Sequence, residues 1–268
     1  MILPKRLRHR SKALILLKTM SYGIRILLKI ILRGMTLRHI ILLALVLSLF
    51  SCDSFLGKSN FSSSKEGSYS EGRIVYKITY LDYGNSTMNP ALLPKKMILE
   101  FNQDSCVNSI DGFMGFFHLG NITYFKTKTC STHLKVLDKN YSFAGHRRES
   151  MCCFECMDNM KIKKDTTIKS IAGLNSRKAI VSIPGSNERF EIFYTNEINL
   201  SHPNSTNPYK KIDGVLTQFR LRMGPYYMLF TAAEFSPNAV PKSTLKVPKD
   251  SQKVSREEMT YVLYKLIE

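Results

Sequence analysis

Apolar and polar positions alternate along the segment EGRIVYKITYLDY, residues 71–83. Every second side chain is apolar or aromatic on one side of an extended chain: Ile74, Tyr76, Ile78 and Tyr80. Polar residues, including Arg73 and Lys77, take most of the positions between them. A period of two is typical of a β-strand with one buried face and one face in water. The segment therefore predicts a half-buried strand.

The same alternation recurs along the rest of the chain. Residues 95–110 and residues 121–138 each predict one long strand, and residues 160–168, 177–185 and 189–198 predict three shorter ones. Glycine, proline and asparagine residues mark turns between the later strands. Parallel neighbours would need helical crossovers, for which these gaps are too short. The pattern therefore predicts an antiparallel meander.

Helical periodicity is strongest at residues 255–268, SREEMTYVLYKLIE. Ser255 and Glu258 have the spacing of a capping box, and a stripe of apolar residues recurs at helical spacing: Met259, Val262, Leu263 and Leu266. We expect this helix to cover one face of the sheet. Weaker helix candidates are residues 208–221, interrupted by Gly214, and the aromatic segment 112–118. The fold class predicted is mainly β, with a few covering helices.

The first fifty residues have a different character. Residues 40–50, IILLALVLSLF, form an apolar run of eleven residues with a single serine, Ser48, whereas a bilayer-spanning helix needs about 20. Arg33 and Arg38 precede this run, and the small residue Ser51 follows it, as in an export signal. A chain that started at Met35 would still contain a complete signal, so residues 1–34 are either an artefact of start-codon choice or a long signal extension.

The sequence Leu49-Phe50-Ser51-Cys52 resembles the lipobox of bacterial lipoproteins. This resemblance implies cleavage between Ser51 and Cys52 and attachment of a diacylglycerol to the Cys52 sulfur, which would anchor the chain to a membrane. The alternative is an ordinary buried thiol. The serine-rich tract that follows is typical of a flexible tether. We therefore expect a signal region over 1–51, a lipidated cysteine and tether over 52–70, and a folded domain over 71–268.

The positive charge is concentrated in the signal region. Residues 1–51 contain ten of the 39 Lys and Arg residues and none of the 21 Asp and Glu residues. The remaining chain is moderately basic, and its lysines lack the interleaved aromatic residues of a nucleic-acid-binding surface. No nucleic-acid partner is expected.

Three segments carry a resemblance to a known family. Residues 171–183 (IAGLNSRKAIVSI), 190–198 (FEIFYTNEI) and 207–221 (NPYKKIDGVLTQFRL) resemble, in order and approximate spacing, the GLPGLI-type and related uncharacterised exported proteins of Bacteroidota. The chain departs from that pattern at Leu174-Asn175-Ser176, and Ile212 to Leu216 is a loose version of the signature turn. Such families are similar to the superfamily of periplasmic lipoprotein carriers. The resemblance implies a single strongly curved, unclosed antiparallel sheet, an open half-barrel, with a cavity suited to acyl chains.

Motifs for catalysis or metal binding are weak. The segment CCFEC, residues 152–156, has one two-residue cysteine gap, but a structural zinc site normally shows a second pair. Cys106 and Cys130 are candidates to face each other on neighbouring strands. His118, His133 and His146 show no carboxylate at ligand or catalytic spacing, and no nucleophile elbow or phosphate loop occurs. No enzymatic activity, cofactor or metal is expected.

The sequence thus favours a lipoprotein of the cell envelope, anchored to the outer membrane and facing the periplasm, that binds a lipid or other apolar ligand. Residues proposed to face the ligand are Ile74, Tyr76, Ile78, Phe190 and Ile192. These same residues could instead fill a solid core. The alternative function is a structural lipoprotein with a filled core that docks on an envelope protein partner.

Overall fold

A computed structural model describes residues 67–267, apart from residues 87, 116, 148–156, 158, 186, 242 and 249. The described chain forms one sheet of twelve strands. Their bounds are β1 Gly72–Asp82, β2 Lys96–Phe101, β3 Ser105–Asp111, β4 Phe117–Tyr124, β5 Thr129–Val136, β6 Lys139–His146, β7 Lys161–Ile171, β8 Leu174–Ser182, β9 Arg189–Thr195, β10 Val215–Met223, β11 Tyr226–Ser236 and β12 Gln252–Lys253. Two 3-10 turns, η1 (Pro90–Leu92) and η2 (Phe113–Gly115), and one α-helix, α3 (Arg256–Ile267), complete these elements.

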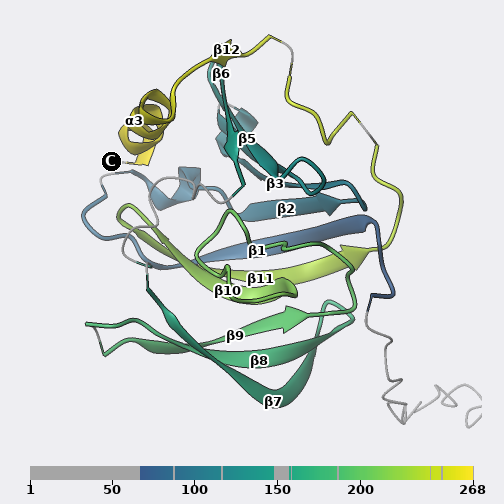
Figure 1. The fold of residues 1–268 in the computed structure, drawn as a ribbon. Coiled ribbons are helices and arrows are strands. Elements are labelled where there is room, and N and C mark those ends of the chain that lie inside the picture. Colours follow the sequence, from purple (N-terminus) through teal and green to yellow (C-terminus); the bar gives the residue numbers. More distant parts are fainter. Residues whose placement is uncertain are drawn as a thin grey trace, which may run out of the picture. The chain divides into compact units, whose positions relative to one another are not determined.

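The sheet is strongly curved and does not close on itself. Its strand order is β12-β6-β5-β4-β3-β2-β1-β11-β10-β9-β8-β7, so that β12 and β7 are the two edges (Figure 1). All neighbouring strands are antiparallel except the short pair β12–β6, which is parallel. The predicted open, mainly antiparallel half-barrel with a C-terminal helix is confirmed. Loops, rather than several helices, supply most of its cover.

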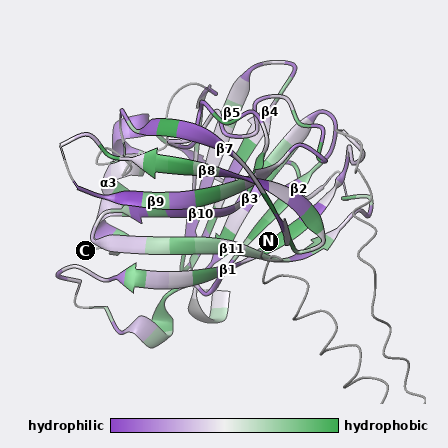
Figure 2. Cartoon of the chain, turned by 90° about the horizontal axis from the view of Figure 1, so that it is seen from below, coloured by the Kyte–Doolittle hydropathy of each residue, from purple (hydrophilic) through white to green (hydrophobic). Residues whose placement is uncertain are grey.

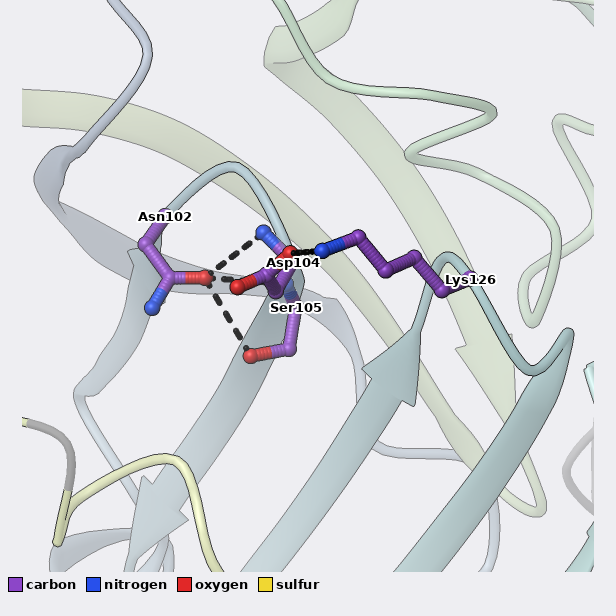
Figure 3. Close-up of polar contacts among 4 residues, drawn as sticks. All are labelled: Asn102, Asp104, Ser105 and Lys126. Atoms are coloured by element: carbon purple, nitrogen blue, oxygen red, sulfur yellow. Dashed lines mark hydrogen bonds and ion pairs between the residues drawn. The ribbon is translucent and has the colours of Figure 1, made fainter.

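The two segments predicted as single long strands are each a hairpin. Residues 95–110 contain β2 and β3, and residues 121–138 contain the end of β4 and all of β5. At the β2–β3 turn the Asn102 side-chain oxygen accepts hydrogen bonds from the backbone N–H groups of Asp104 and Ser105, both at 2.9 Å (Figure 3). Asparagine side chains stabilise turns in this way. The polar residues at this position therefore form the turn of a hairpin, whereas the sequence pattern predicts that they lie on the solvent-exposed face of one strand.

Of the three helix predictions, only the C-terminal one is confirmed. In α3 the Glu258 N–H donates to Ser255 Oγ at 3.1 Å, and the Ser255 N–H donates to Glu258 Oε2 at 2.7 Å, which is the predicted capping box. The helix predicted over residues 208–221 is wrong, because strand β10 begins at Val215. Residues 112–118 give only η2 and the start of β4.

The core lies on the concave face of the sheet. Alternate residues of β1 face it and pair with alternate residues of β2 and β11: Ile74 with Leu99, Tyr76 with Met97 and Ala232, and Ile78 with Phe230. These side chains are buried and belong to one continuous apolar cluster. The convex face is covered only locally, where Leu245 from the segment between β11 and β12 packs against Val107 and Ile122.

The two edges of the sheet differ. Strand β12 is only two residues long, whereas β7 is eleven residues long. Most of β7 is exposed and hydrophilic, and it is drawn largely purple in Figure 2. It carries Lys161, Lys163, Lys164 and Lys169, and its pairing with β8 is irregular between Lys164 and Ile168. Lysines and a bulge protect a long edge strand from pairing with other chains.

Residues Ser63–Glu268 form a compact unit by their internal contacts. Within the described residues this unit contains the whole sheet and its apolar core, as an independently folding domain does. The chain joins the sheet at its start, where the Gly67 N–H donates to the Asn196 carbonyl and Tyr69 bridges to Ile198. In residues 67–267, outside the gaps given above, no helix has the length and apolar character needed to span a bilayer.

Candidate functional site

An apolar cavity of about 270 Å³ lies at one end of the concave face. This end is where β1 and β3 finish and where β2, β4 and β11 begin. The cavity is roofed by the η1 segment and by the last turn of α3. Its lining residues are Ile78, Tyr80, Met88, Leu92, Leu93, Pro94, Ile110, Gly112, Phe117, Leu119, Met223, Tyr226, Met228 and Leu266.

The polar atoms in this wall already have partners. The Tyr80 hydroxyl donates to the Pro94 carbonyl at 2.9 Å, and the hydroxyls of Tyr226 and Ser86 are hydrogen-bonded at 2.6 Å. Burial raises the pKa of Tyr80, and the neighbouring Tyr226 and Tyr83 add to that rise, so the phenol stays neutral. The wall therefore presents a neutral, apolar surface whose hydrogen bonds are already made.

The cavity is bordered by apolar side chains that also reach solvent. Leu92 is 44% exposed and Met88 is 37% exposed, although both line the cavity. Other exposed apolar residues lie at the same end of the sheet: Leu81, Tyr83, Met114 and Leu137. Each lies at or just beyond a strand end or in a turn between strands. These residues place exposed apolar surface at the end of the sheet where the cavity lies.

The loop between β9 and β10, residues 196–214, packs into the concave face beyond this cavity. Tyr209 from this loop is fully buried, packs edge-to-face against Phe219 at 6.0 Å and donates a hydrogen bond to the Arg220 carbonyl. Ile212 is also buried at its base. Nearby, the hydroxyl of Tyr76 in β1 donates to the carbonyl of Leu216 in β10 at 2.7 Å. The loop thus takes the space that stays open at the other end.

A second, smaller cavity of about 90 Å³ lies beside the first. The two share four lining residues: Ile110, Leu119, Met223 and Met228. The smaller cavity differs by having polar side chains in its wall: Asn108, Asn121, Thr206 and Asn207. We call the larger space the outer chamber and the smaller one the inner chamber. The flexible side chains of Met223 and Met228 lie between them.

The structure separates the five residues predicted to face a ligand. Ile78 lines the outer chamber. The other four, Ile74, Tyr76, Phe190 and Ile192, are at most 4% exposed and line neither chamber. Burial raises the pKa of Tyr76 as well. Ile78 therefore stays the candidate for direct ligand contact, and the other four belong to the apolar core.

Most of the chamber-lining residues had not been singled out from the sequence. Tyr226 and Met228 belong to β11, whose alternating segment YYMLFTAAEFS could have identified it as a strand. Met88, Leu92 and Leu93 lie in and around η1, where no periodicity marks them. Leu266 was predicted as part of the helical stripe, and the structure places it in the cavity wall.

The cysteine predictions have separate outcomes. Ser51, Cys52 and the CCFEC segment lie outside the described residues. The prediction that Cys106 and Cys130 face each other is wrong: β4 lies between their strands, both pair with Thr123 of β4, and neither forms a disulfide. Two strand spacings, about 9–10 Å, exceed the Cα separation that a disulfide allows.

The three histidines considered in the sequence, His118, His133 and His146, lie on the convex face. His118 Nδ1 lies 2.7 Å from Asp111 Oδ1, a pairing between β3 and β4 that the sequence did not reveal. The His133 ring is 5.7 Å from that of His118, and burial, helped by His118 and Lys135, lowers the His133 pKa. No cluster of three or more potential metal-ligating side chains occurs in the part of the chain that the structure describes.

No protein-family model matches the chain, and a search of curated proteins finds no sequence match. The resemblance to the GLPGLI-type families therefore stays a prediction. The cavity itself is the basis of the function proposed below.

Proposed function

We propose that the chain is a membrane-anchored envelope lipoprotein whose half-barrel binds a lipid or other apolar ligand. The observation that carries this proposal is the outer chamber, about 270 Å³ in volume and lined by apolar side chains. Interiors of proteins are packed so closely that few voids exceed the size of a water molecule. Pockets for small organic ligands begin at roughly 300 Å³. The chamber is therefore close to ligand size.

The chamber also sets the size of the ligand. A dry cavity of about 150 Å³ lined by Leu, Ile and Phe binds benzene, which has six carbons, so this chamber has room for roughly ten. Each buried methylene contributes about 0.8 kcal/mol. Ten would contribute on the order of 8 kcal/mol before the entropy cost of association is subtracted. That gain is sufficient for reversible binding.

The membrane anchor is supported by the lipobox-like sequence ending at Cys52. Two or three acyl chains hold a protein stably at a membrane, whereas one is marginal. The anchor is tested by growing cells that express the full chain with labelled palmitate. Label is expected in the wild-type chain and absent from Cys52→Ser. Recovery of an unlabelled wild-type chain from the cytosol would contradict the anchor.

The ligand is tested separately on the unit Ser63–Glu268, purified from bacteria without detergent. Circular dichroism first verifies the β-sheet, and native mass spectrometry then measures any bound mass. A co-purifying apolar molecule is expected, together with saturable uptake of the neutral dye N-phenyl-1-naphthylamine. A protein that is always empty and takes up no dye would favour the alternative, a structural lipoprotein that docks on an envelope protein.

A further inference from the structure

The wall of the inner chamber contains a polar atom that has no partner. Asn121 is 3% exposed, and its side-chain N–H donates to Thr132 Oγ1 at 3.1 Å. Its carbonyl oxygen, Oδ1, is buried and accepts no hydrogen bond. Buried polar groups in proteins almost always have a partner, because leaving one unpaired costs about 1–3 kcal/mol. The residue lines the inner chamber, so a small shift of its side chain would bring this buried oxygen into contact with a group held there.

Both chambers are also free of charge. None of the described residues that line them is Asp, Glu, Lys, Arg or His. A carboxylate or phosphate in the inner chamber would therefore meet no cation, and burying an unpaired charge is strongly unfavourable. A neutral group that donates one hydrogen bond suits this chamber.

The two chambers lie in line along β4. Phe117 lines the outer chamber, Leu119 lines both, and Asn121 lines the inner chamber. Alternate residues of a strand point to the same face, and four residues of strand span about 13 Å. A chain of roughly ten carbons that filled the outer chamber would thus have one end at the inner chamber.

From these observations we infer that the ligand is an uncharged amphiphile that enters with a hydroxyl or similar donor leading. Its apolar body fills the outer chamber, and its donor group bonds to Asn121 Oδ1. This inference assumes the apolar-ligand function proposed above and narrows it to one chemical class. Anionic lipids are predicted to keep their charged group at the mouth, outside the inner chamber.

The test compares decanol with its isomer methyl nonyl ether, which cannot donate a hydrogen bond. Affinities are measured by displacement of N-phenyl-1-naphthylamine from the unit Ser63–Glu268. Two variants are matched: Asn121→Leu removes the carbonyl oxygen, and Thr123→Val removes a buried hydroxyl two residues further along β4, at a position that lines neither chamber. The ratio of decanol affinity to ether affinity is compared between proteins, so that differences in the water solubility of the two ligands cancel.

We expect the decanol-to-ether ratio to fall by about tenfold in Asn121→Leu and to stay within about twofold of wild type in Thr123→Val. An unchanged ratio in Asn121→Leu would overturn the inference, because the orphan oxygen would then be satisfied by water alone. A ratio that rises would mean that the inner chamber offers a donor instead of an acceptor, which also overturns it. If Asn121→Leu does not fold, decanol-dependent protection of the Asn121 side-chain amide, followed by NMR in the wild-type protein, decides the same point.

A third ligand, decanoate at pH 8, tests the prediction that a charged group stays outside the inner chamber. Its affinity is expected to be equal in wild type and Asn121→Leu, since its carboxylate stays at the mouth. A tenfold loss in the variant would show that the inner chamber accepts an anion and would contradict the inference. If none of the ligands nor the dye binds, the proposed function itself fails, which is a different result from equal binding of decanol and ether.

Discussion

The two ends of the concave face are built from the same kinds of residue, but one end is packed with side chains and the other contains a cavity. At one end the loop 196–214 inserts Tyr209 and Ile212 among the strand side chains, and neither of these residues lines a chamber. At the other end η1 and the last turn of α3 roof the sheet without filling it, and the outer chamber remains. We call these the filled end and the hollow end.

This difference shows that alternation along a strand does not create a binding site by itself. Ile74 and Ile78 lie on the same face of β1, four residues apart, and both are almost completely buried. One packs in a solid core and the other lines a chamber. The cover over each position decides its role, and the cover comes from segments far away in the sequence.

The largest predicted effect concerns Cys106, which lies away from the chambers in the dense part of the core. Burial raises the pKa of its thiol to about 12, so the reactive thiolate is rare in the folded protein. A rise of that size lowers the thiolate fraction at pH 8 by about 1,000-fold. Alkylation by iodoacetamide, followed at Cys106 by peptide mass spectrometry, should be at least that much slower in native than in urea-unfolded protein. Comparable rates in the two states would mean that this core is open to solvent.

A second prediction removes the residue that fills the filled end. Tyr209→Ala should lower the free energy of unfolding by about 3–5 kcal/mol, because it deletes a fully buried aromatic ring. Tyr209→Phe is the control: it loses only the hydrogen bond to the Arg220 carbonyl and should cost about 1 kcal/mol. Urea denaturation measures both. Equal, small losses for the two variants would contradict the role of the ring.

A matched pair of substitutions compares the two ends directly. Ile74→Phe overpacks the filled end and should destabilise the protein by about 1–3 kcal/mol. Ile78→Phe adds the same atoms beside the outer chamber, where they can occupy empty space, and should leave stability unchanged or raise it by about 1 kcal/mol.

Binding should respond in the opposite order. Ile78→Phe is expected to weaken uptake of N-phenyl-1-naphthylamine by at least about tenfold, whereas Ile74→Phe, once folded, should bind like wild type. If both variants bound the dye equally well, the chamber would not be its binding site.

A smaller effect is expected at the start of α3. Ser255→Ala removes the hydroxyl that accepts from the Glu258 N–H and should cost about 1 kcal/mol of stability. Because Leu266 near the other end of this helix roofs the outer chamber, fraying of α3 should also speed ligand release. Ser255→Asp, which retains a capping oxygen, is the control for both thermal melting and dissociation kinetics. If Ser255→Asp also released the ligand faster, the helix cap would not be what controls ligand release from the chamber.

The smallest effects are expected at the β2–β3 turn, far from the hollow end. Asn102→Ala should cost about 1 kcal/mol, because two backbone N–H groups lose their acceptor. The ion pair between Lys126 and Asp104 next to it is exposed, at 2.6 Å (Figure 3), and Asp104→Asn should change stability by less than about 0.5 kcal/mol. Neither variant should alter dye binding. Thermal melts at low and high salt distinguish the two contributions, since only the ion pair is screened.

Part of the candidate site could be predicted from the sequence. The period-two pattern of residues 71–83 correctly places Ile78 and Tyr80 on the inner face, and the helical stripe of α3 contains Leu266. The pattern could not show that Tyr226 and Met228 would lie opposite them, because the register of β11 against β1 involves residues about 150 positions apart. The pattern also failed at residues 95–110 and 121–138, where it predicted single strands in place of hairpins, because polar turn residues and polar strand positions look alike in the sequence.

The sequence by itself determined the class of the fold. Alternating residues have only one way to remove their apolar face from water, which is a sheet with one covered side, and the capping box at Ser255 determined where the last helix starts. Only the tertiary structure decided where the sheet is hollow. That depends on whether a distant loop supplies a side chain such as Tyr209 or merely a roof, and the volume left over is a property of the packed molecule and not of any one segment.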